Sequence, residues 1–460
     1  MIQETISKSK PKVALETFGC QMNVYDSEVA SGLLEHQGFQ LAKDEEKADV
    51  VLMNTCSVRE HAEDKVYSRL GALGKIKKTN PNLIIGLMGC MVEEHKEKLF
   101  KRFPQLDLMV GTRNIKELPA LIEEVKQNRK QVARIKQDGI SIEYTDQIKR
   151  TGKFHAWLPI MTGCDKICTY CIVPITRGAE VSMPAREVYR EASRLAEEGV
   201  QWITLLGQNV NSYSPEGMSK SPRAVPDASA AGIRENGFPE LLEMLCEING
   251  LERISFTTSH PHDATEELFQ AIKRQPKISR RFHLPLQSGS DRILKRMKRL
   301  HTYEGYKAKV DRLRKLVPDV SMTTDIIAGF SGETEEDHKA TLAALSEIRY
   351  DSAYIYKYSI RQQTPAAKLP DDVPFEIKES RNRELLELQK QISEENNRKQ
   401  LGQIVSVFVE KANPRIPDQL IGRTDREKTI AFPGPESLIG QFRKVKLNSL
   451  HNETLIGQLV

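Results

Sequence analysis

The sequence predicts an α/β protein that carries a small all-β domain at its carboxyl end. Three patterns indicate this. The first 130 residues alternate short apolar runs with amphipathic segments, a central region repeats that rhythm six times, and the last 60 residues hold short alternating runs separated by Gly, Pro or Asn. At roughly 150 residues per domain, a chain of 460 residues suggests about three domains. We place them at 11–127, 150–397 and 398–460.

The amino-terminal region predicts a parallel sheet wrapped by helices. Strands are expected at 13–15, 50–53, 83–88 and 106–110, and helices at 26–36, 60–76 and 93–102. Cys20, Cys56 and Cys90 follow the first three strand runs, one cysteine after each. Ligands collect at the carboxyl ends of the strands in such sheets, so we expect one common site for the three thiols. The alternative is three unrelated small buried residues.

The central region predicts an incomplete barrel of six βα units, whose chemistry belongs at the carboxyl ends of its strands. Residues 127–153 read as a linker before it, and 214–237 as an insertion loop within it. Strands are expected at 157–161, 202–206, 254–257, 282–286, 320–327 and 353–358. Helices are expected at 186–198, 239–248, 264–273 and 334–348, with a long charged helix at 376–400.

The last segment predicts a small β-barrel, with strands at 404–409, 418–424, 429–432, 443–446 and 454–460. It is mildly basic, with 10 Lys or Arg against 6 Asp or Glu in residues 398–460. A stronger excess lies at 271–320, with 15 against 4. Concentrated positive charge favours an anionic partner such as a nucleic acid, and solvated helix faces are the plainer explanation.

The composition excludes some classes of protein. With 39% hydrophobic and 28% charged residues, the chain is globular and not disordered. There is no run of 18 apolar residues and no basic-then-apolar segment near Met1, so we expect a cytoplasmic protein with no membrane partner. Seven cysteines, an odd number, argue against a disulfide framework. Cys246 lies in a helical apolar stripe and is expected in the core.

Cys164, Cys168 and Cys171 form a C-x3-C-x2-C run directly after the first strand of the barrel-like series. Structural zinc prefers four ligands, whereas three thiolates can hold three irons of a [4Fe–4S] cluster and leave the fourth iron open for a small chelating ligand. The alternative is a zinc site completed by a histidine such as His155.

This run resembles the signature of the radical S-adenosylmethionine superfamily, in which an aromatic residue, here Tyr170, precedes the last cysteine. Further segments resemble the methylthiotransferase family within it, and the terminal barrel resembles the RNA-binding TRAM domain. The matching segments are Thr17–Asn23, Asn54–Glu60, Gly89–Met91, Gly207–Asn211, Ser259–Pro261 and Leu284–Ser290. The resemblance covers nearly the whole chain apart from the 214–237 insertion.

Residues after the first two cysteines indicate the branch of that family. Gln-Met-Asn after Cys20 and Ser-Val-Arg-Glu after Cys56 resemble the branch acting on isopentenyl-adenosine in tRNA. The rival branches act on threonylcarbamoyl-adenosine in tRNA or on an aspartate of a ribosomal protein. A non-catalytic iron–sulfur RNA-binding protein is the alternative from another class, and two separate triads argue against it.

The resemblance implies two [4Fe–4S] clusters and two S-adenosylmethionine molecules per turnover. Cys164, Cys168 and Cys171 would hold the cluster that generates a 5′-deoxyadenosyl radical, and Cys20, Cys56 and Cys90 an auxiliary cluster that carries sulfur. The product would be a methylthio group at carbon 2 of the adenine next to the anticodon, at position 37. Implied partners are the tRNA anticodon stem-loop, a low-potential electron donor such as flavodoxin or ferredoxin, and iron–sulfur assembly and sulfur-donor proteins.

Other assignments rest on position alone. Tyr170, Gln208, Gln287 and Asp325 are candidates for holding S-adenosylmethionine, and each has a purely structural alternative. Three basic residues of the central region, Arg296, Lys298 and Arg299, are candidates for tracking phosphates, with a solvated helix face as the alternative. His260 and His262 suggest zinc, but a loop role after a strand is favoured.

Overall fold

The computed structural model describes residues 10–42, 47–57, 60–135, 144–214 and 237–460. The expected insertion at 214–237 therefore lies almost wholly outside the described residues. The chain divides into two compact units. The first comprises 1–151, 162–165 and 172–181, and the second comprises 152–161, 166–171 and 182–460. None of the described helices is both long and apolar enough to cross a membrane.

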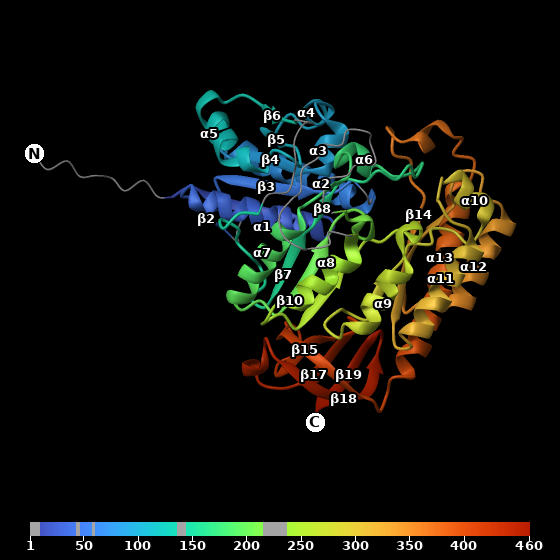
Figure 1. Cartoon of the computed structure of the whole chain (residues 1–460). Coiled ribbons are helices and arrows are strands. Elements are labelled where there is room, and N and C mark those ends of the chain that lie inside the picture. Colours follow the sequence, from blue (N-terminus) through green and yellow to red (C-terminus); the bar gives the residue numbers. More distant parts are fainter. Residues whose placement is uncertain (1–9, 43–46, 58–59, 136–143, 215–236) are drawn as a thin grey trace, which may run out of the picture. The chain divides into compact units, whose positions relative to one another are not determined.

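The first unit is built on a six-stranded parallel sheet in the order β2-β1-β3-β4-β5-β6 (Figure 1). Its strands are β1 (Lys12–Thr17), β2 (Gln40–Leu41), β3 (Val50–Thr55), β4 (Ile84–Gly89), β5 (Leu108–Val110) and β6 (Val132–Arg134). Its helices are α1 (Gln21–His36), α2 (Glu60–Thr79), α3 (Cys90–His95), α4 (Lys98–Arg102), η2 (Ile115–Glu117), α5 (Leu118–Asn128) and α6 (Val173–Thr176).

Apolar residues of β3 and β4 are buried without exception, as strands covered on both faces require. Helices α2, α3 and α4 supply one core, in which Val66, Leu70 and Leu99 pack on the side of the sheet that carries Val51 and Met53. Helices α1 and α5 contact each other and these strands, covering the opposite face. The predicted sheet is therefore confirmed, with β2 and β6 added at its two edges.

The second unit holds six parallel strands in two three-stranded sheets, β11-β10-β7 and β12-β13-β14. A parallel bridge joins Ile254 in β11 to Ile278, which lies shortly before β12, and so links the two sheets. The strands are β7 (His155–Pro159), β10 (Trp202–Leu206), β11 (Arg253–Phe256), β12 (Arg281–His283), β13 (Ser321–Ala328) and β14 (Ser352–Lys357). Strands β8 (Met161–Thr162) and β9 (Val181–Ser182) pair beside the cysteine loop.

Helices separate these strands, as a partial barrel requires. They are α7 (Ala185–Glu197), η3 (Val210–Ser212), α8 (Gly237–Cys246), η4 (Pro261–Asp263), α9 (Glu266–Arg274), α10 (Asp291–Arg296), α11 (Tyr303–Leu316), α12 (Glu335–Ile348), η5 (Pro365–Lys368) and α13 (Phe375–Arg398). Side-chain caps fix several starts. Thr334 and Asp337 form a reciprocal capping box on α12, and Thr302 caps α11. Helices α10 and α11 were not predicted from the sequence.

The carboxyl-terminal strands close into a barrel in the order β15-β16-β17-β19-β18. They are β15 (Ile404–Ala412), β16 (Gln419–Thr424), β17 (Thr429–Pro433), β18 (Phe442–His451) and β19 (Thr454–Leu459), with the short helix η6 (Glu436–Leu438). Val407, Leu420 and Phe432 are among the residues that fill its interior. The predicted fold class, an α/β protein with a partial barrel and a terminal β-barrel, is confirmed.

Candidate iron–sulfur sites

The outer triad lies at the carboxyl edge of the first sheet. Cys20 follows β1 as the N-cap of α1, Cys56 follows β3, and Cys90 begins α3 directly after β4. The chain approaches closely here, since a Cβ on Gly19 would lie 2.6 Å from the Cβ of Cys56. Gly19 also has φ +139, a backbone conformation that side chains rarely adopt. Glycine at this position lets two of the cysteines approach each other.

Amide side chains hold these loops together. Asn23 accepts a hydrogen bond from the Cys20 thiol at 3.2 Å, and its Nδ2 donates to Asn54 Oδ1 at 3.0 Å and to the Thr55 carbonyl at 3.1 Å. Asn54 Nδ2 donates back to the Asn23 carbonyl at 2.8 Å. Asn23 and Asn54 are fully buried, so this network fixes the loops after β1 and β3.

The electrostatics of the triad differ from one cysteine to another. The pKa of Cys20 is lowered to about 6. The largest cause is a hydrogen bond from Cys56; burial acts to raise the pKa, and the Arg177 charge helps to lower it. Burial raises the pKa of Cys90, and the Arg177 guanidinium opposes that rise. A buried arginine that favours thiolates was not predicted from the sequence.

The C-x3-C-x2-C loop is divided between the two units, so its parts are described separately. In the first unit, the Cys164 backbone N–H donates to the Gly178 carbonyl at 3.1 Å. In the second, the Cys171 N–H donates to the Cys168 carbonyl at 3.2 Å, and Thr169 is fixed by its N–H to Met297 at 3.0 Å. The Arg299 guanidinium lies 3.4 Å from the Cys168 sulfur and also donates to the Pro285 carbonyl at 3.0 Å.

Two further groups brace the same loop. Lys166 Nζ lies 2.9 Å and 2.7 Å from the two carboxylate oxygens of Asp263, and Asn209 Nδ2 donates to Asp263 at 2.8 Å. Burial acts to raise the pKa of Asp263, but hydrogen bonds from His262, Lys166 and Asn209 lower it to about 2. Sequence reasoning missed Lys166 and Asp263. Two of the matching family segments could have pointed to Asp263. Gly207–Asn211 contains its partner Asn209, and Ser259–Pro261 ends two residues before Asp263.

The four candidates for S-adenosylmethionine binding lie in the second unit: Tyr170 in the cysteine loop, Gln208 and Gln287 after strands, and Asp325 within β13. Tyr170 packs edge-on to Phe330, and burial raises the pKa of its phenol, with Cys168, Cys171 and Asp325 acting in the same direction. Gln287 is buried at φ +75, and its backbone N–H donates to the Asp325 carbonyl at 2.9 Å. Gln208 follows β10 and is half-buried. The Asp325 side chain lies 3.4 Å from His283 Nε2.

Several basic and histidine side chains have internal partners. Arg296 donates to the Ser331 carbonyl at 3.1 Å, and Arg299 reaches Cys168, so two of the three proposed phosphate contacts point inward. Lys298 remains exposed. His262 donates its backbone N–H to His260 Nδ1 at 3.1 Å in η4, directly after β11.

His155, the suggested fourth zinc ligand, begins β7 at the end away from the cysteine loop and pairs with Thr204 at 2.8 Å. Burial lowers its pKa to about 4. Cys246 is buried at the end of α8, where burial raises its pKa to about 11.

The donor atoms of each triad fit a cluster better than a single ion. Among the described residues, Glu63, Glu94 and His95 bring one ligand atom each within 4.8 Å of the others, as a single ion needs. Each triad instead offers three thiols, one set after successive strands of one sheet and the other within one short loop. A polynuclear cluster is bound at separate irons and takes all-thiolate ligation, so both triads fit that group by chemistry and spacing.

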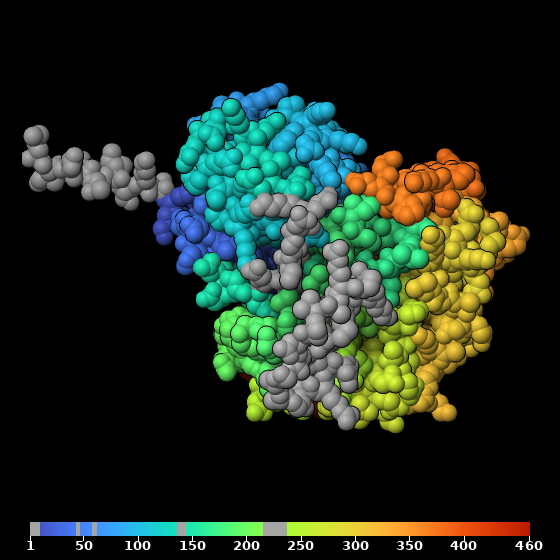
Figure 2. All heavy atoms as spheres, turned by 45° about the horizontal axis from the view of Figure 1, so that its top comes forward, coloured from blue at the N-terminus to red at the C-terminus, as the bar shows by residue number. Residues whose placement is uncertain are grey.

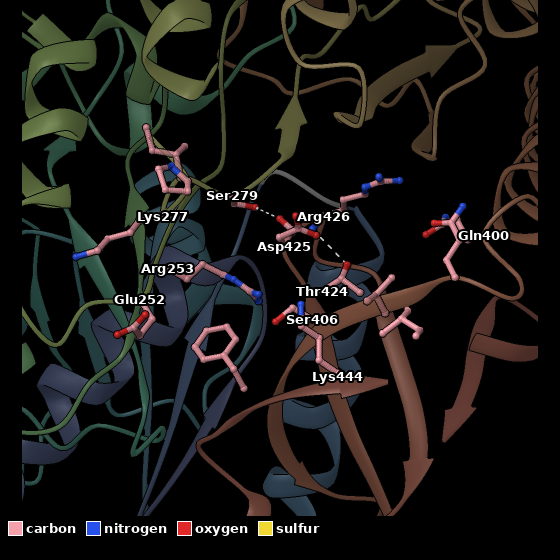
Figure 3. Close-up of a pocket in the computed structure, with 16 residues that line it drawn as sticks. Glu252, Arg253, Lys277, Ser279, Gln400, Ser406, Thr424, Asp425, Arg426 and Lys444 are labelled. Atoms are coloured by element: carbon pink, nitrogen blue, oxygen red, sulfur yellow. Dashed lines mark hydrogen bonds between the residues drawn. The ribbon is translucent and has the colours of Figure 1, made fainter. Parts of the chain in front are cut away.

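A pocket of about 410 Å³ lies in the second unit, between the terminal barrel and the segments that carry Arg253 and Lys277 (Figure 3). Four cationic side chains and two carboxylates are among its lining residues: Arg253, Lys277, Arg426, Lys444, Glu252 and Asp425. Arg253 is held between the rings of Trp202 and Phe442, at 4.9 Å and 5.1 Å from their centroids. The basic segment 271–320 runs nearby and forms much of the yellow surface in Figure 2.

Comparison with known proteins identifies three domains in the chain. Profiles of the uncharacterized protein family UPF0004, the Radical SAM superfamily and the TRAM domain match residues 12–111, 158–345 and 398–460. The fold is shared with solved radical S-adenosylmethionine enzymes. The methyltransferase TsrM from Kitasatospora setae gives a TM-score of 0.53 at 13% identity, covering 78% of this chain and 77% of that one. The present chain therefore carries a Radical SAM domain followed by a TRAM domain.

Closer relatives define the family. A tRNA-2-methylthio-N(6)-dimethylallyladenosine synthase from Dictyoglomus thermophilum is 42% identical over 98% of this chain and 99% of its own length. One from Carboxydothermus hydrogenoformans is 43% identical over 96% of this chain and 98% of its own. The chain belongs to the tRNA-2-methylthio-N(6)-dimethylallyladenosine synthase family. The resemblance to methylthiotransferases is confirmed.

Proposed function

We propose that this protein inserts a methylthio group at carbon 2 of N(6)-isopentenyladenosine at position 37 of tRNA. The observation that carries the proposal is the convergence of Cys20, Cys56 and Cys90 at one sheet edge, in a chain that also holds the C-x3-C-x2-C loop. Family membership over nearly the full length supports the same reaction and the same substrate.

Two [4Fe–4S] clusters are part of this proposal. When bound, with S-adenosylmethionine at the core site, they would supply a hydrogen-abstracting radical and a sulfur atom, chemistry needed because the C2–H of adenine is not acidic enough for a side-chain base. Cys164, Cys168 and Cys171 hold the core cluster, and Cys20, Cys56 and Cys90 hold the outer one.

The remaining side chains keep these ligands in place. Arg299 places a positive charge 3.4 Å from the Cys168 sulfur, where it would counter the negative charge of a bound cluster. Lys166 and Asp263 fix the loop between Cys164 and Cys168. We assign Tyr170, Gln208, Gln287 and Asp325 to binding S-adenosylmethionine, from their place in or beside the cysteine loop, β10 and β13.

The RNA partner is assigned to the basic surfaces of the second unit. Cations around the pocket in Figure 3 outnumber its carboxylates, and the terminal barrel contributes Arg426 and Lys444 to it. Phosphate contacts of this kind position an RNA, while a splayed loop base is read in a separate pocket. The protein acts in the cytoplasm on the anticodon stem-loop, and a flavodoxin or ferredoxin supplies the electrons and iron–sulfur assembly proteins supply the clusters and sulfur.

The test is the choice of substrate. The anaerobically reconstituted protein is given S-adenosylmethionine, dithionite and one of four acceptors: tRNA with isopentenyl-adenosine, the same tRNA unmodified, tRNA with threonylcarbamoyl-adenosine, or a ribosomal protein with the acceptor aspartate. Mass spectrometry should find the methylthio product only with the first. Modification of another acceptor in its place contradicts the assignment.

A further inference from the structure

A buried arginine lies beside the outer triad. Arg177 follows α6, and its side chain is 4% exposed. Its backbone is fixed by the loop after β5, since Arg113 Nη2 donates to the Arg177 carbonyl at 2.8 Å and Thr112 Oγ1 to the Thr176 carbonyl at 3.2 Å. Arg177 Nη2 donates to Asp26 Oδ2 at 2.7 Å. The backbone at Arg177 and its guanidinium are therefore each held by hydrogen bonds.

This guanidinium lies in the neighbourhood of the cysteines. Helix α6, which Arg177 follows, packs against α3, which begins at Cys90. The partner of Arg177, Asp26, lies on α1, which begins directly after Cys20, and the Arg177 charge acts to lower the pKa of both Cys20 and Cys90. Burying an arginine is costly unless opposite charge surrounds it. Asp26 supplies one such charge and the thiolates of the triad supply the rest, so the arginine is placed where a cluster's negative charge would gather.

Charge next to a cluster controls how easily the cluster accepts an electron. Reduction adds a negative charge to a group already made negative by three thiolates, and a buried cation favours that added charge at low local dielectric. Hydrogen bonds to cluster ligands act in the same direction. A carboxylate beside the cation has the opposite effect.

We propose that Arg177 is a positioning residue of the outer site, whose buried positive charge raises the reduction potential of the outer cluster, and that Asp26 orients the guanidinium and limits the rise. The inference rests on the proposed function, because it requires a cluster on Cys20, Cys56 and Cys90. Arg177 lies only six positions after Cys171 in the sequence, so the segment that leaves the core motif also supplies the cation of the outer site.

The experiment isolates the outer cluster in the full-length chain. The parent carries Cys164→Ala, Cys168→Ala and Cys171→Ala and is reconstituted anaerobically with iron and sulfide. Arg177→Gln, Arg177→Lys and Asp26→Asn are added singly. Lys77→Gln is the matched control, because Lys77 pairs with Asp107 just before β5, at the opposite edge of the same sheet. Iron content and an EPR-monitored potential titration are measured on each.

The expected signature is a pair of opposite shifts. Arg177→Gln should lower the reduction potential, Asp26→Asn should raise it, and Arg177→Lys and Lys77→Gln should leave it close to the parent. Opposite shifts distinguish charge from mere support of the fold. If Arg177→Gln fails to hold the cluster, the rise in Asp26→Asn still decides the matter.

Three outcomes overturn the inference. Unchanged potentials in Arg177→Gln and Asp26→Asn, or shifts of both in one direction, reject the electrostatic role. Equal loss of iron from Arg177→Lys and Asp26→Asn without a change in potential assigns the pair to folding alone. A parent that binds no iron rejects the second cluster itself, and the inference falls with it.

Discussion

Lys166, within the C-x3-C-x2-C loop, forms an ion pair with Asp263 in η4, the short helix after β11, with Nζ 2.7 Å from Oδ2. The side chains are 17% and 13% exposed, so the pair is largely shielded from water. It ties the loop that carries the core cysteines to a neighbouring strand end. Asp263 also accepts from Asn209, in the loop after β10, so segments that follow three different strands are joined around one carboxylate.

Asp263→Asn should therefore loosen the core loop. Removing one partner of a shielded pair leaves Lys166 uncompensated, and we expect a loss of about 1–3 kcal/mol in unfolding free energy. Formation of 5′-deoxyadenosine per core iron should fall several-fold. Glu266→Gln is the control, since its pair with Arg312 is exposed and should change neither quantity measurably. Equal effects of the two substitutions contradict this role.

The two triads should bind iron independently. Reconstituted protein should hold about eight irons per chain, and replacing Cys164, Cys168 and Cys171 by Ala should leave about half. Iron and sulfide assays measure both values. A triple variant without iron, or a wild-type chain that takes up zinc instead, contradicts two separate clusters.

The triads should also differ in their chemistry. Cys56→Ala removes an outer ligand, so methylthio transfer should be abolished while reductive cleavage of S-adenosylmethionine persists. Cys168→Ala should abolish both. The measurements are 5′-deoxyadenosine under dithionite and the modified nucleoside. If Cys56→Ala keeps its core cluster but makes no 5′-deoxyadenosine, the division between the triads is wrong.

The pocket cations should contribute to tRNA binding through phosphates. Arg426→Ala and Lys444→Ala should weaken binding and each lower the salt dependence of the association constant by about one unit. Lys339→Ala, on the exposed face of α12, is the control. These substitutions are cleaner than deleting 398–460, because deletion would uncover Trp202, whose ring lies 5.8 Å from that of Phe408. Unchanged affinity across salt concentrations rejects the assignment.

Two buried histidines should make stability depend on pH. Burial lowers the pKa of His260 to about 2 and of His301 to about 3, while both titrate near 6.5 when unfolded. The unfolded chain therefore binds more protons below pH 6.5, and stability should fall as pH drops from 6.5 toward 4. The apoprotein should lose about 1–2 kcal/mol per histidine by pH 5. His301→Asn should flatten this slope in denaturant titrations at several pH values, and an unaltered slope contradicts it.

Much of the fold was accessible from the sequence because buried parallel strands read as continuous apolar runs. The β10 strand was predicted at its observed bounds, Trp202–Leu206. Edge strands β2 and β6 were missed, since two or three residues carry no measurable period. Helix α11 was not predicted, because its sequence is rich in charged residues and its buried face is narrow, consisting of Tyr306, Val310 and Leu313. Thr302 marks its start.

The site was predictable only where its residues fall into short motifs. The cysteines stand out by spacing and by their place after strands. Arg177 and Asp26 are 151 positions apart, and no local pattern pairs them. The same holds for Lys166 and Asp263, 97 positions apart. Such pairs depend on how loops from separate strands meet, which only the folded chain reveals.

Within the second unit, the terminal barrel is joined to the partial barrel by specific polar contacts and not only by apolar packing. Glu427 forms ion pairs and hydrogen bonds with Arg281 and Ser279, and the Arg280 N–H donates to the Asp425 carbonyl at 2.8 Å. A chimaera in which residues 398–460 are replaced by a barrel without an acidic residue at the place of Glu427 would therefore leave Arg281 without its ion-pair partner. A transfer of the barrel to another protein should therefore include residues 279–281 as part of the same segment.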